Sequence, residues 1–399
     1  MSFKRLLPVV PGGVVVGATA GALALLAPAA VPAISPLVIY GTLVLAVLLG
    51  WRFHSPRVAA AALVLIAAFA VLQSTRLADS ALARVLFATF VPLGMALLTL
   101  SSDQGAVLPR LRTHLALALM PLLAGASFTA SDPAGALELL TADYIDSLYS
   151  SWSSLPQLAL LALFVALVMA LTRTLLTRRA VDAGMAATVV AVACALAATP
   201  ASREQTLWIV AAALVLIFAI IEAAYRLAFY DELTELPGRR ALTQALHALR
   251  GPYAVAIVDV DHFKLFNDQH GHDTGDQVLR MVATHLRRVQ GGGTAFRSGG
   301  EEFTVVFPWL SKREASEHME EVREAIAGTR FAVRQQPRPR GKNAQQKRGR
   351  GASGKQFNVT ISVGVAAPTA KYNTASAVLK LADKAMYRAK SEGRNRVIA

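Results

Sequence analysis

The sequence has a single cysteine among its 399 residues, Cys194, which lies in an apolar stretch. An intrachain disulfide is therefore excluded, and cysteine usage leaves the redox compartment open. Acidic residues are also scarce, with 26 Asp and Glu against 40 Lys and Arg, and charged residues make up only 17% of the chain. The hydrophobic fraction of 54% is too high for an ordinary soluble protein.

The shortage of charge is confined to one part of the chain. Up to about Tyr225 the sequence is dominated by Ala, Leu and Val, whereas charge density rises beyond that point. A chain of this length has room for two or more domains. We therefore expect a multi-pass α-helical membrane domain over residues 1–225 and a soluble domain over residues 226–399. The many apolar segments after the start favour a first transmembrane helix over a cleaved leader.

A helix needs about 20 mostly apolar residues to cross a bilayer. Pro and Gly interrupt the first, second and fifth candidate stretches, so six spans are the alternative to a count of eight. The eight predicted spans are about 8–30, 34–51, 57–74, 80–100, 112–128, 155–172, 180–199 and 205–225.

Charge in the connecting loops predicts the orientation, because cytoplasmic loops hold the Lys and Arg. The stretch 129–154 has four acids and neither Lys nor Arg, which places it on the other side. Both termini are then expected in the cytoplasm, since basic residues precede the first span and follow the second, fourth and sixth: Lys4, Arg5, Arg52, Arg57, Arg110, Arg112, Arg173, Arg178 and Arg179.

The spans show no buried pair of ionisable groups of the kind that marks an ion pathway. Glu222, the main acidic candidate, lies near the cytoplasmic end of the last span, where snorkelling is the ordinary explanation. An anchor or sensor is therefore favoured over a transporter. The acidic stretch 129–154 is either a binding site for an external signal or a solvated loop.

The soluble half alternates strand-like and helix-like segments. An apolar run, "YAVAIVDV", has Asp259 next to its end and is followed by the turn-rich "NDQHGHDTGD". A helix, a hairpin over about 294–308, another helix, a strand "FNVTISVGVA" and a last helix complete the order. The order β-α-β-β-α-β plus a helix predicts an α+β ferredoxin-like sheet with helices on one face.

The hairpin contains the sequence "RSGGEEFTVVF". Gly299 and Gly300 suit a tight turn, because both residues tolerate positive φ. Glu301 and Glu302 stand at the mouth of a core strand, where carboxylates repel each other unless a cation is present. A solvated hairpin tip is the alternative. In a ferredoxin-like sheet the first strand lies beside this hairpin, so Asp259 meets the two glutamates.

Converging carboxylates in an open coordination shell suit Mg²⁺ or Mn²⁺, whose shell substrate phosphates and water complete. Three histidines nearby, His262, His270 and His272, raise the alternative of zinc. The absence of cysteine there and the presence of carboxylates argue against it.

Five blocks in order carry a resemblance to a known family. They are "DELTELPGRR", "DVDHFKLFNDQHGHDTGDQVL", "RSGGEEF", "TISVGVA" and "ADKAMYRAKSEGRNRV", and together they resemble the GGDEF family of diguanylate cyclases over about 227–399. A GGEEF motif alone would be weak, whereas five blocks in sequence are specific. The resemblance implies a palm-like catalytic domain that joins two GTP into cyclic di-GMP and releases two pyrophosphates. It also implies an active homodimer that holds one GTP per subunit.

The resemblance implies roles for individual residues. Asp259, the carbonyl of Val260 and Glu301 would hold the metal ions with help from Glu302, and Glu301 would also act as a base toward the ribose 3′-hydroxyl. The substrate-contacting positions are Asn267 and Asp276 for the guanine edge, His272 in the same block, Phe263 and Lys264 for phosphate, and Lys390 and Arg394 for its far end. Spacing alone would make Lys390 and Arg394 favourable charges at a helix C-terminus.

The chain departs from the family at three places. Glu235 stands where the family usually has Gly, and Gly238 where it usually has Asn. The insertion 334–356 holds eight Lys or Arg and no acid, which is typical of disorder. A solvated loop, a contact with anionic lipid and a contact with nucleic acid are all open, although no aromatic residue there supports base stacking.

The third departure concerns product inhibition. Many members of the family carry Arg-x-x-Asp just upstream of the hairpin, where the dimeric product binds. The matching place here is Gln290 to Gly293, so the arginine and the aspartate are both absent. We expect no inhibitory product site there.

These observations predict a diguanylate cyclase in the inner membrane of a bacterium, with its catalytic domain in the cytoplasm. Its expected partners are GTP, a second copy of the chain, membrane lipid and an unidentified signal or protein, without nucleic acid. The alternative is a catalytically inactive nucleotide receptor that acts through a partner.

Overall fold

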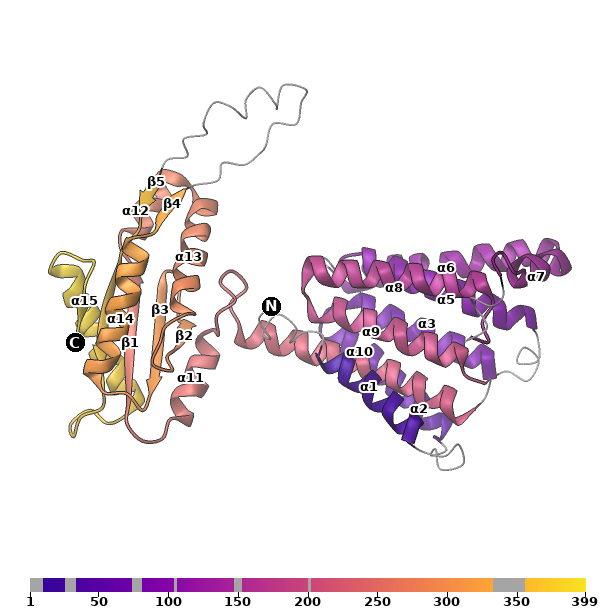
Figure 1. Ribbon diagram of the computed structural model, residues 1–399, viewed down its shortest axis with the longest axis horizontal. Helices are drawn as coiled ribbons and strands as arrows, with labels where there is room; N and C mark the ends of the chain where they lie inside the picture. The colour runs from indigo at the N-terminus through magenta and orange to yellow at the C-terminus, as the bar shows by residue number, and fades with distance from the viewer. Residues whose placement is uncertain are drawn as a thin grey trace, which may run out of the picture. The chain divides into compact units, whose positions relative to one another are not determined.

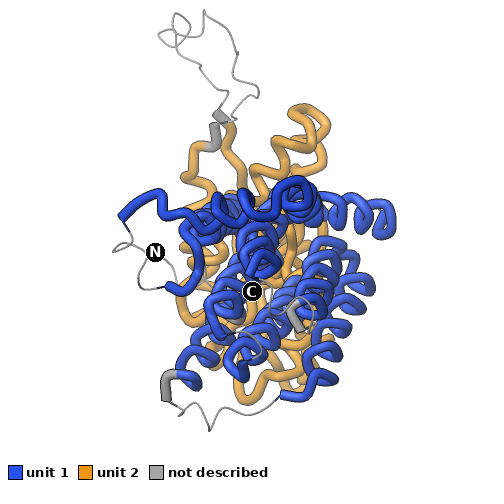
Figure 2. Tube along the Cα trace, turned by 90° about the vertical axis from the view of Figure 1, so that its right-hand side faces the viewer, with its two compact units in different colours: residues 1–225 blue, residues 226–399 orange. Residues whose placement is uncertain are grey.

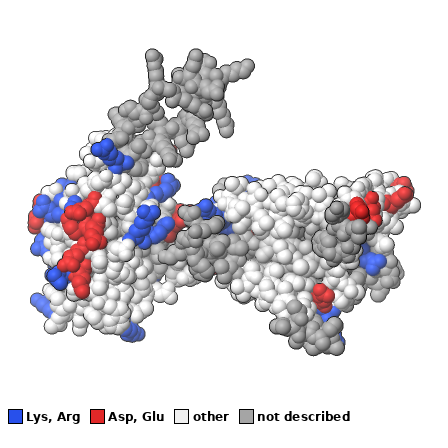
Figure 3. Space-filling model, in the orientation of Figure 1, with Lys and Arg blue, Asp and Glu red and all other residues white. Residues whose placement is uncertain are grey.

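The computed structural model describes residues 10–25, 34–73, 81–103, 106–146, 153–199, 202–332 and 356–399. Its contacts divide the chain into two compact units, Met1–Tyr225 and Arg226–Ala399, which Figure 2 shows in different colours. We refer to them as the N-terminal and C-terminal units. Apart from Gln356, the insertion 334–356 lies outside the described residues. The visible surface of the N-terminal unit carries few charged atoms, whereas that of the C-terminal unit mixes both signs (Figure 3).

The described part of the N-terminal unit is helical throughout (Figure 1). Polar caps and prolines start some of these helices: Ser35 accepts from Leu37 N before Pro36, and Asp132 accepts from Gly135 N before Pro133. The helices are α1 (Val10–Leu25), α2 (Pro36–Arg52), α3 (Pro56–Gln73), α5 (Ala81–Leu100), α6 (Val107–Ser131), α7 (Pro133–Thr141), α8 (Gln157–Thr177), α9 (Ala180–Ala197) and α10 (Arg203–Phe229).

Five of these helices are long and apolar enough to cross a membrane: α5, α6, α8, α9 and α10. The other three predicted spans coincide with shorter apolar helices, α1, α2 and α3. A count of eight spans therefore remains a prediction. The acidic stretch 129–154 contains the short helix α7, which the prediction of a loop had missed.

Small residues bring the helices of this unit close together. At Gly94 in α5, an added Cβ would lie 2.1 Å from the carbonyl oxygen of Ala118 in α6. A side chain there would separate the two helices. Close backbone approach at glycine and alanine is the usual way in which helices pack when lipid surrounds them.

A buried ionic network lies at one end of this bundle. Arg57 is 2% exposed, and it pairs with Asp103 at 2.8 Å and with Asp182 at 2.7 Å. Asp182 also accepts a hydrogen bond from Thr177. This buried pair was not foreseen from the sequence, although Arg57 and Asp182 both fall inside predicted spans. The partners lie at helix ends and link the beginnings of α3 and α9 with the turn after α5, so they tie one end of the bundle together and do not form a path across it.

The C-terminal unit is built on a five-stranded mixed sheet with the order β2-β3-β1-β6-β7. Its first four strands have the order expected of a ferredoxin-like sheet and pair antiparallel, whereas β7 adds to β6 in parallel. The strands are β1 (Tyr253–Val260), β2 (Thr294–Arg297), β3 (Glu302–Pro308), β6 (Ile361–Ala366) and β7 (Val397–Ile398). The predicted strand "FNVTISVGVA" is divided into β6 and β5 (Gln356–Asn358), and β5 pairs with β4 (Arg330–Ala332) in a separate two-stranded sheet.

The sheet is covered on both faces, so the expectation of helices on one face is wrong. Alternate β1 side chains belong to two different clusters: Ala256 packs with Val282 and Met319, whereas Val255 packs with Leu242 and Val378. The first cluster draws on α13 (His272–Leu286) and α14 (Lys312–Ala327), and the second on α11 (Arg239–Ala248) and α15 (Ala375–Ser391). In Figure 1 these helices flank the strands.

Two local features position the site. The segment predicted to be turn-rich, 267–276, is instead mostly helical: it covers the end of α12 (Phe263–His270) and the start of α13, which are separated by Gly271 at φ 82°. At Gly364 in β6, an added Cβ would lie 2.1 Å from both the Ala382 oxygen and the Met386 nitrogen. The glycine thus lets the backbone of α15 rest directly on the sheet.

Candidate active site

Strand pairing brings the acidic residues of two segments together. In the register of β1 and β3, Asp259 lies opposite Glu302, and Glu301 occupies the preceding turn. Because Asp259 and Glu302 are direct cross-strand neighbours, their side chains stand on the same face of the sheet. That face is the one covered by α11 and α15.

The glycines of the hairpin turn do not use left-handed backbone angles. Neither Gly299 nor Gly300 has positive φ, so the prediction made from their conformational freedom is wrong. The turn is held instead by Arg297, whose Nε and Nη2 donate to the carbonyl oxygen of Gly300 at 3.2 and 2.7 Å. An added Cβ at Gly300 would meet open space. The described fold therefore gives no steric reason for glycine at position 300.

An open cavity of about 390 Å³ lies beside this turn. It brings together seven of the predicted site residues: Asp259, Val260, Phe263, Lys264, Glu301, Lys390 and Arg394. Four others, Glu302, Asn267, His272 and Asp276, do not line it. The cavity thus combines three carboxylates, since Asp268 lines it beside Asp259 and Glu301, with three cations, contributed by four separate parts of the chain.

Lys390 lies against the buried carboxylate. Its Nζ is 2.8 Å from Asp259 Oδ1, an ion-pair distance, although the contact lacks the angles of a hydrogen bond. Burial raises the pKa of Asp259 above its usual range; Lys390 opposes that shift, and the charges of Glu302 and Asp261 add to it. Burial likewise raises the pKa of Glu301, with a further contribution from Asp259 and an opposing one from Lys390.

The donor set fits a divalent cation of the Mg²⁺ type. Asp259 Oδ1 is buried beside a single cation, Lys390, and the neighbouring carboxylates contribute to the raised pKa values of Asp259 and Glu301. Hard carboxylate oxygens crowded at a cavity are the ligands that such ions prefer, and a bound cation relieves this repulsion. No group of three His, Cys, Asp or Glu side chains is assembled for a metal within the described ranges.

The predicted guanine-binding residues lie on two adjacent helices. Asn267 is in α12 and Asp276 is in α13, and both are partly exposed. Asn267 Oδ1 is buried without a hydrogen-bond partner in the described part of the chain, and it faces Gly275, where an added Cβ would lie 1.8 Å away. His272 is exposed at the start of α13. These three residues lie on α12 and α13 and are not part of the cavity lining.

The structural role of two acidic residues near the site was not predicted from the sequence. Asp231 accepts from Nη1 of Arg297, which ties the entry turn of the unit to the hairpin. Asp261 is buried and accepts hydrogen bonds from Thr360 and Ser362 at the start of β6 and from the turn after α15. Both acids lie inside sequence blocks that match the family, which could have marked them as candidates. Their spacing in the sequence does not indicate which residues they contact.

Comparison with known proteins covers this unit. Residues 228–396 match the family described as "Diguanylate cyclase, GGDEF domain". The C-terminal unit is a GGDEF domain. Through this unit the chain belongs to the GGDEF diguanylate cyclase family.

Two relatives of the GGDEF domain show the extent of the similarity. The response regulator PleD of Caulobacter vibrioides is 35% identical over 187 residues, which cover 45% of this chain and 37% of PleD. The diguanylate cyclase DgcP of Pseudomonas aeruginosa is 35% identical over 178 residues, or 43% of this chain and 24% of DgcP. The chain thus spans less than half the length of these relatives.

A solved structure has a similar domain. It contains the coiled coil and GGDEF domain of DgcB from Caulobacter crescentus in complex with c-di-GMP. The sequence identity is 31%, the TM-score is 0.38, and the match covers 45% of this chain and 89% of the other.

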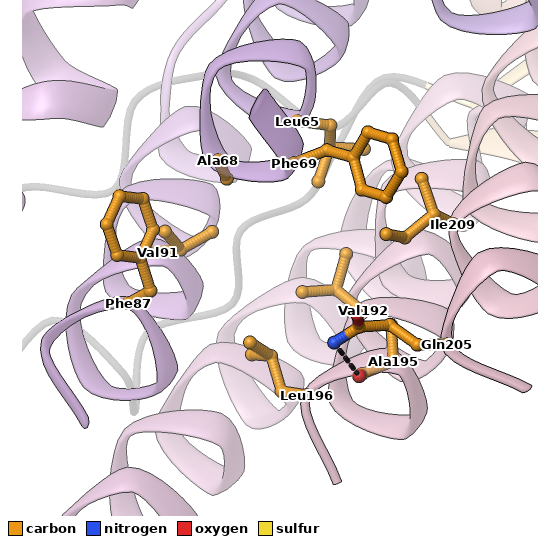
Figure 4. A pocket seen from close by; sticks show the side chains of 10 residues that line it. All are labelled: Leu65, Ala68, Phe69, Phe87, Val91, Val192, Ala195, Leu196, Gln205 and Ile209. Atoms are coloured by element: carbon orange, nitrogen blue, oxygen red, sulfur yellow. Dashed lines mark hydrogen bonds between the residues drawn. The ribbon is translucent and has the colours of Figure 1, made fainter. Parts of the chain in front are cut away.

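A second cavity lies among helices of the N-terminal unit. It has a volume of about 30 Å³ and is bordered by apolar side chains of α3, α5, α9 and α10 (Figure 4). The amide of Gln205 points to its edge but donates to the carbonyl oxygen of Ala195 at 3.2 Å. The lining offers no chemistry that would select a particular ligand, so we regard this cavity as a packing gap.

Proposed function

We propose that this protein is a membrane-bound diguanylate cyclase that condenses two GTP into cyclic di-GMP. In each of two steps, a ribose 3′-oxygen attacks the α-phosphorus of the other nucleotide. The bond from that phosphorus to the bridging oxygen breaks, and pyrophosphate leaves. The observation that carries the proposal is the cavity in which Asp259 and Glu301 face Lys264, Lys390 and Arg394.

The acidic residues would hold the divalent ion. Asp259, the carbonyl of Val260, Glu301 and Glu302 would be its ligands. When bound, Mg²⁺ or Mn²⁺ neutralises charge on the phosphate oxygens and favours ionisation of the 3′-hydroxyl. Glu301 would accept the hydroxyl proton, a role that suits a carboxylate whose pKa is raised by burial.

The remaining residues would orient the nucleotide. Lys264, Lys390 and Arg394 would supply positive charge for the phosphates. Phe263 is buried and lines the same cavity. Asn267 and Asp276 would read the guanine edge, since an amide can donate to its acceptors and a carboxylate can accept from its N–H groups. His272, exposed on α13, would border the base.

The two nucleotides require two sites, so the active form would be a homodimer with one GTP in each subunit. The N-terminal unit would anchor the protein in the bacterial inner membrane and receive a signal, with lipid around its apolar helices. Its five helices of sufficient length support membrane insertion. Both termini and the GGDEF domain would lie in the cytoplasm, where GTP is available.

The test uses the full chain in detergent with GTP and Mg²⁺, and it measures cyclic di-GMP by chromatography. Wild type is expected to form product, whereas Asp259→Asn and Glu301→Gln are expected to lose at least about 100-fold in rate. Glu317→Gln is the matched control, because Glu317 is an exposed glutamate on α14. Activity of either site variant at the wild-type rate would contradict the metal assignment.

One observation favours a second candidate, an inactive nucleotide receptor. Lys390 sits where a cation would bind Asp259, and no three acidic or histidine ligands converge in the described structure. A folded dimer that binds GTP in the presence of Mg²⁺ but releases no pyrophosphate would support the receptor and exclude the cyclase.

A further inference from the structure

The turn that carries Arg394 has a strained backbone. Gly393, Arg394 and Asn395 have positive φ angles of 111°, 61° and 43°. Glycine adopts such angles freely and asparagine tolerates them, but Arg394 is strained in this region. The turn therefore needs contacts from elsewhere in the fold to keep this conformation.

Asp261 provides one of these contacts. It follows β1 directly, and its side chain is buried, with 8% of the residue exposed. Its Oδ2 accepts a hydrogen bond from the backbone N–H of Asn395 at 3.1 Å. Because a charged acceptor strengthens a hydrogen bond, this contact holds the turn more firmly than a neutral acceptor would.

The carboxylate of Asp261 is itself fixed to the sheet. Oδ2 accepts from Thr360 Oγ1 at 2.7 Å and Oδ1 accepts from Ser362 Oγ at 2.6 Å. The backbone N–H of Asp261 donates to the Thr360 carbonyl at 3.0 Å. From the other side, Arg323 donates to the side-chain oxygen of Asn395 at 2.8 Å. The strained turn is thus tied to the end of β1 and to α14.

The residue that this turn presents is a cation of the cavity. Arg394 lines it together with Lys390, but Lys390 already faces Asp259 at 2.8 Å. Across the described ranges, Arg394 forms no ion pair. The guanidinium of Arg394 is therefore available to a polyphosphate chain, which it can bind through several N–H groups.

We propose that Asp261 is a positioning residue for phosphate recognition: by holding the N–H of Asn395, it keeps Arg394 directed into the cavity. The proposal rests on the proposed function for the identity of the ligand, a nucleoside triphosphate. Asp261 does not touch the ligand and acts only through the turn. Its effect must therefore vanish when Arg394 is removed.

The experiment measures binding of inorganic tripolyphosphate to the full chain in detergent, without added metal, by titration calorimetry. Arg394→Ala and Asp261→Asn are each expected to weaken binding about tenfold, the loss that corresponds to one hydrogen bond to a charged group. The double variant is expected to bind no more weakly than Arg394→Ala alone, because both changes remove the same contact.

Ser362→Ala is the matched control. It removes a partner of Asp261 on the side away from the turn, so it is expected to lower the melting temperature as Asp261→Asn does while keeping affinity within about twofold. Thr360→Val, which removes one of the two donors to Oδ2 while leaving the carboxylate in place, is expected to weaken binding about threefold and only when Arg394 is present. This variant decides the question if Asp261→Asn does not fold.

Two results would overturn the proposal: a loss of affinity on Asp261→Asn or Thr360→Val that persists in the Arg394→Ala background, or a wild-type affinity that does not depend on Arg394. Formation of cyclic di-GMP is scored separately, because tripolyphosphate binding needs neither guanine nor turnover. A protein whose tripolyphosphate affinity depends on Asp261 only when Arg394 is present, and which forms no product, would support the role of Asp261 and contradict the cyclase. A protein that forms cyclic di-GMP, but whose tripolyphosphate affinity does not change on Arg394→Ala, would support the cyclase and contradict the role of Asp261.

Discussion

Nη1 of Arg297 donates to both carboxylate oxygens of Asp231, at 2.8 and 3.0 Å. Asp231 belongs to the turn by which the chain enters the C-terminal unit, and Arg297 ends β2 immediately before the glycine turn of the site. The same guanidinium donates through Nε and Nη2 to Gly300. One side chain thus connects the entry turn to the hairpin beside the cavity.

Breaking this pair should destabilise the C-terminal unit. Arg297→Ala would leave Asp231 partly buried without its cation, at a cost of about 2 kcal/mol. Arg313→Ala is the control, since its pair with Glu317 is exposed, and it should change stability by less than about 0.5 kcal/mol. Thermal unfolding of the full chain in detergent measures both. Equal effects of the two variants would contradict a special role for Arg297.

The same pair predicts a pH dependence of stability. Burial opposes ionisation of Asp231, but hydrogen bonds from Thr234 and Arg297 outweigh it, so the pKa of this carboxyl is below its usual range. A lowered pKa in the folded state gives stability that is present above the unfolded value of about 3.9 and is lost as pH falls through the folded value. The difference in stability between wild type and Arg297→Ala should therefore shrink only below about pH 4.

Glu235→Gly should stabilise the protein. Glu235 has a φ of 57°, a left-handed angle that costs about 1 kcal/mol for a residue with a Cβ. Its contact with Arg287 spans 3.9 Å between exposed side chains and is worth little. After the larger entropy of glycine in the unfolded chain, the net gain should be about 0.5 kcal/mol. Glu235→Ala, which keeps the strained backbone angle, should not increase the free energy of unfolding. If Glu235→Ala and Glu235→Gly stabilise the protein equally, the cause is the loss of the glutamate charge and not the relief of strain.

The rate of product formation should depend jointly on pH and Mg²⁺. Burial raises the pKa values of Asp259 and Glu301, and only their ionised forms bind a cation. The acidic limb of the rate profile should therefore lie above the ordinary carboxyl value of about 4. Raising Mg²⁺ tenfold should move it down by up to about one pH unit, because metal and protons compete. If the acidic limb of the rate profile does not move when Mg²⁺ is raised, the titrating carboxyl groups are not the ones that bind the metal.

Cyclic di-GMP should inhibit weakly or not at all through the place upstream of the hairpin. Gln290 is exposed and donates to the Arg288 carbonyl, and an added Cβ at Gly293 would lie 2.6 Å from the buried ring of Phe307. Restoring an aspartate at position 293 should therefore disturb the core as well. Initial rates against added product test this. Tight inhibition that survives Arg287→Ala and Arg288→Ala would reveal another inhibitory site.

Reporter fusions should place the C-terminus in the cytoplasm. A reporter after Ala399 is expected to respond as cytoplasmic, and one placed after Thr141, at the end of α7, as external. The expectation follows from the basic loops and the acidic stretch 129–154. The opposite pattern would refute the orientation drawn from loop charge.

The meeting of Asp259 with the hairpin was predictable, because strand order and side-chain alternation follow from local sequence. The sequence also indicates that both faces of the sheet are covered. The run "YAVAIVDV" is apolar at almost every position, which is typical of a strand buried on both sides. The expectation of one covered face ignored that signal.

Long-range pairs could not be predicted in the same way. Arg57 meets Asp103 and Asp182 from 46 and 125 residues away, and no periodicity relates them. Likewise, Asp261 contacts Asn395 across 134 residues, although each residue lies in a matched block. Hydrophobic patterns place elements, whereas polar partners depend on how those elements dock.

The contact at Gly364 bears on how natural variants of this protein should be interpreted. A substitution there adds a carbon where α15 touches β6, so the helix must move, and Lys390 moves with it. An allele with such a change would resemble a loss of the active site although every residue of the cavity is intact. Screens that score only the cavity residues would classify it as neutral.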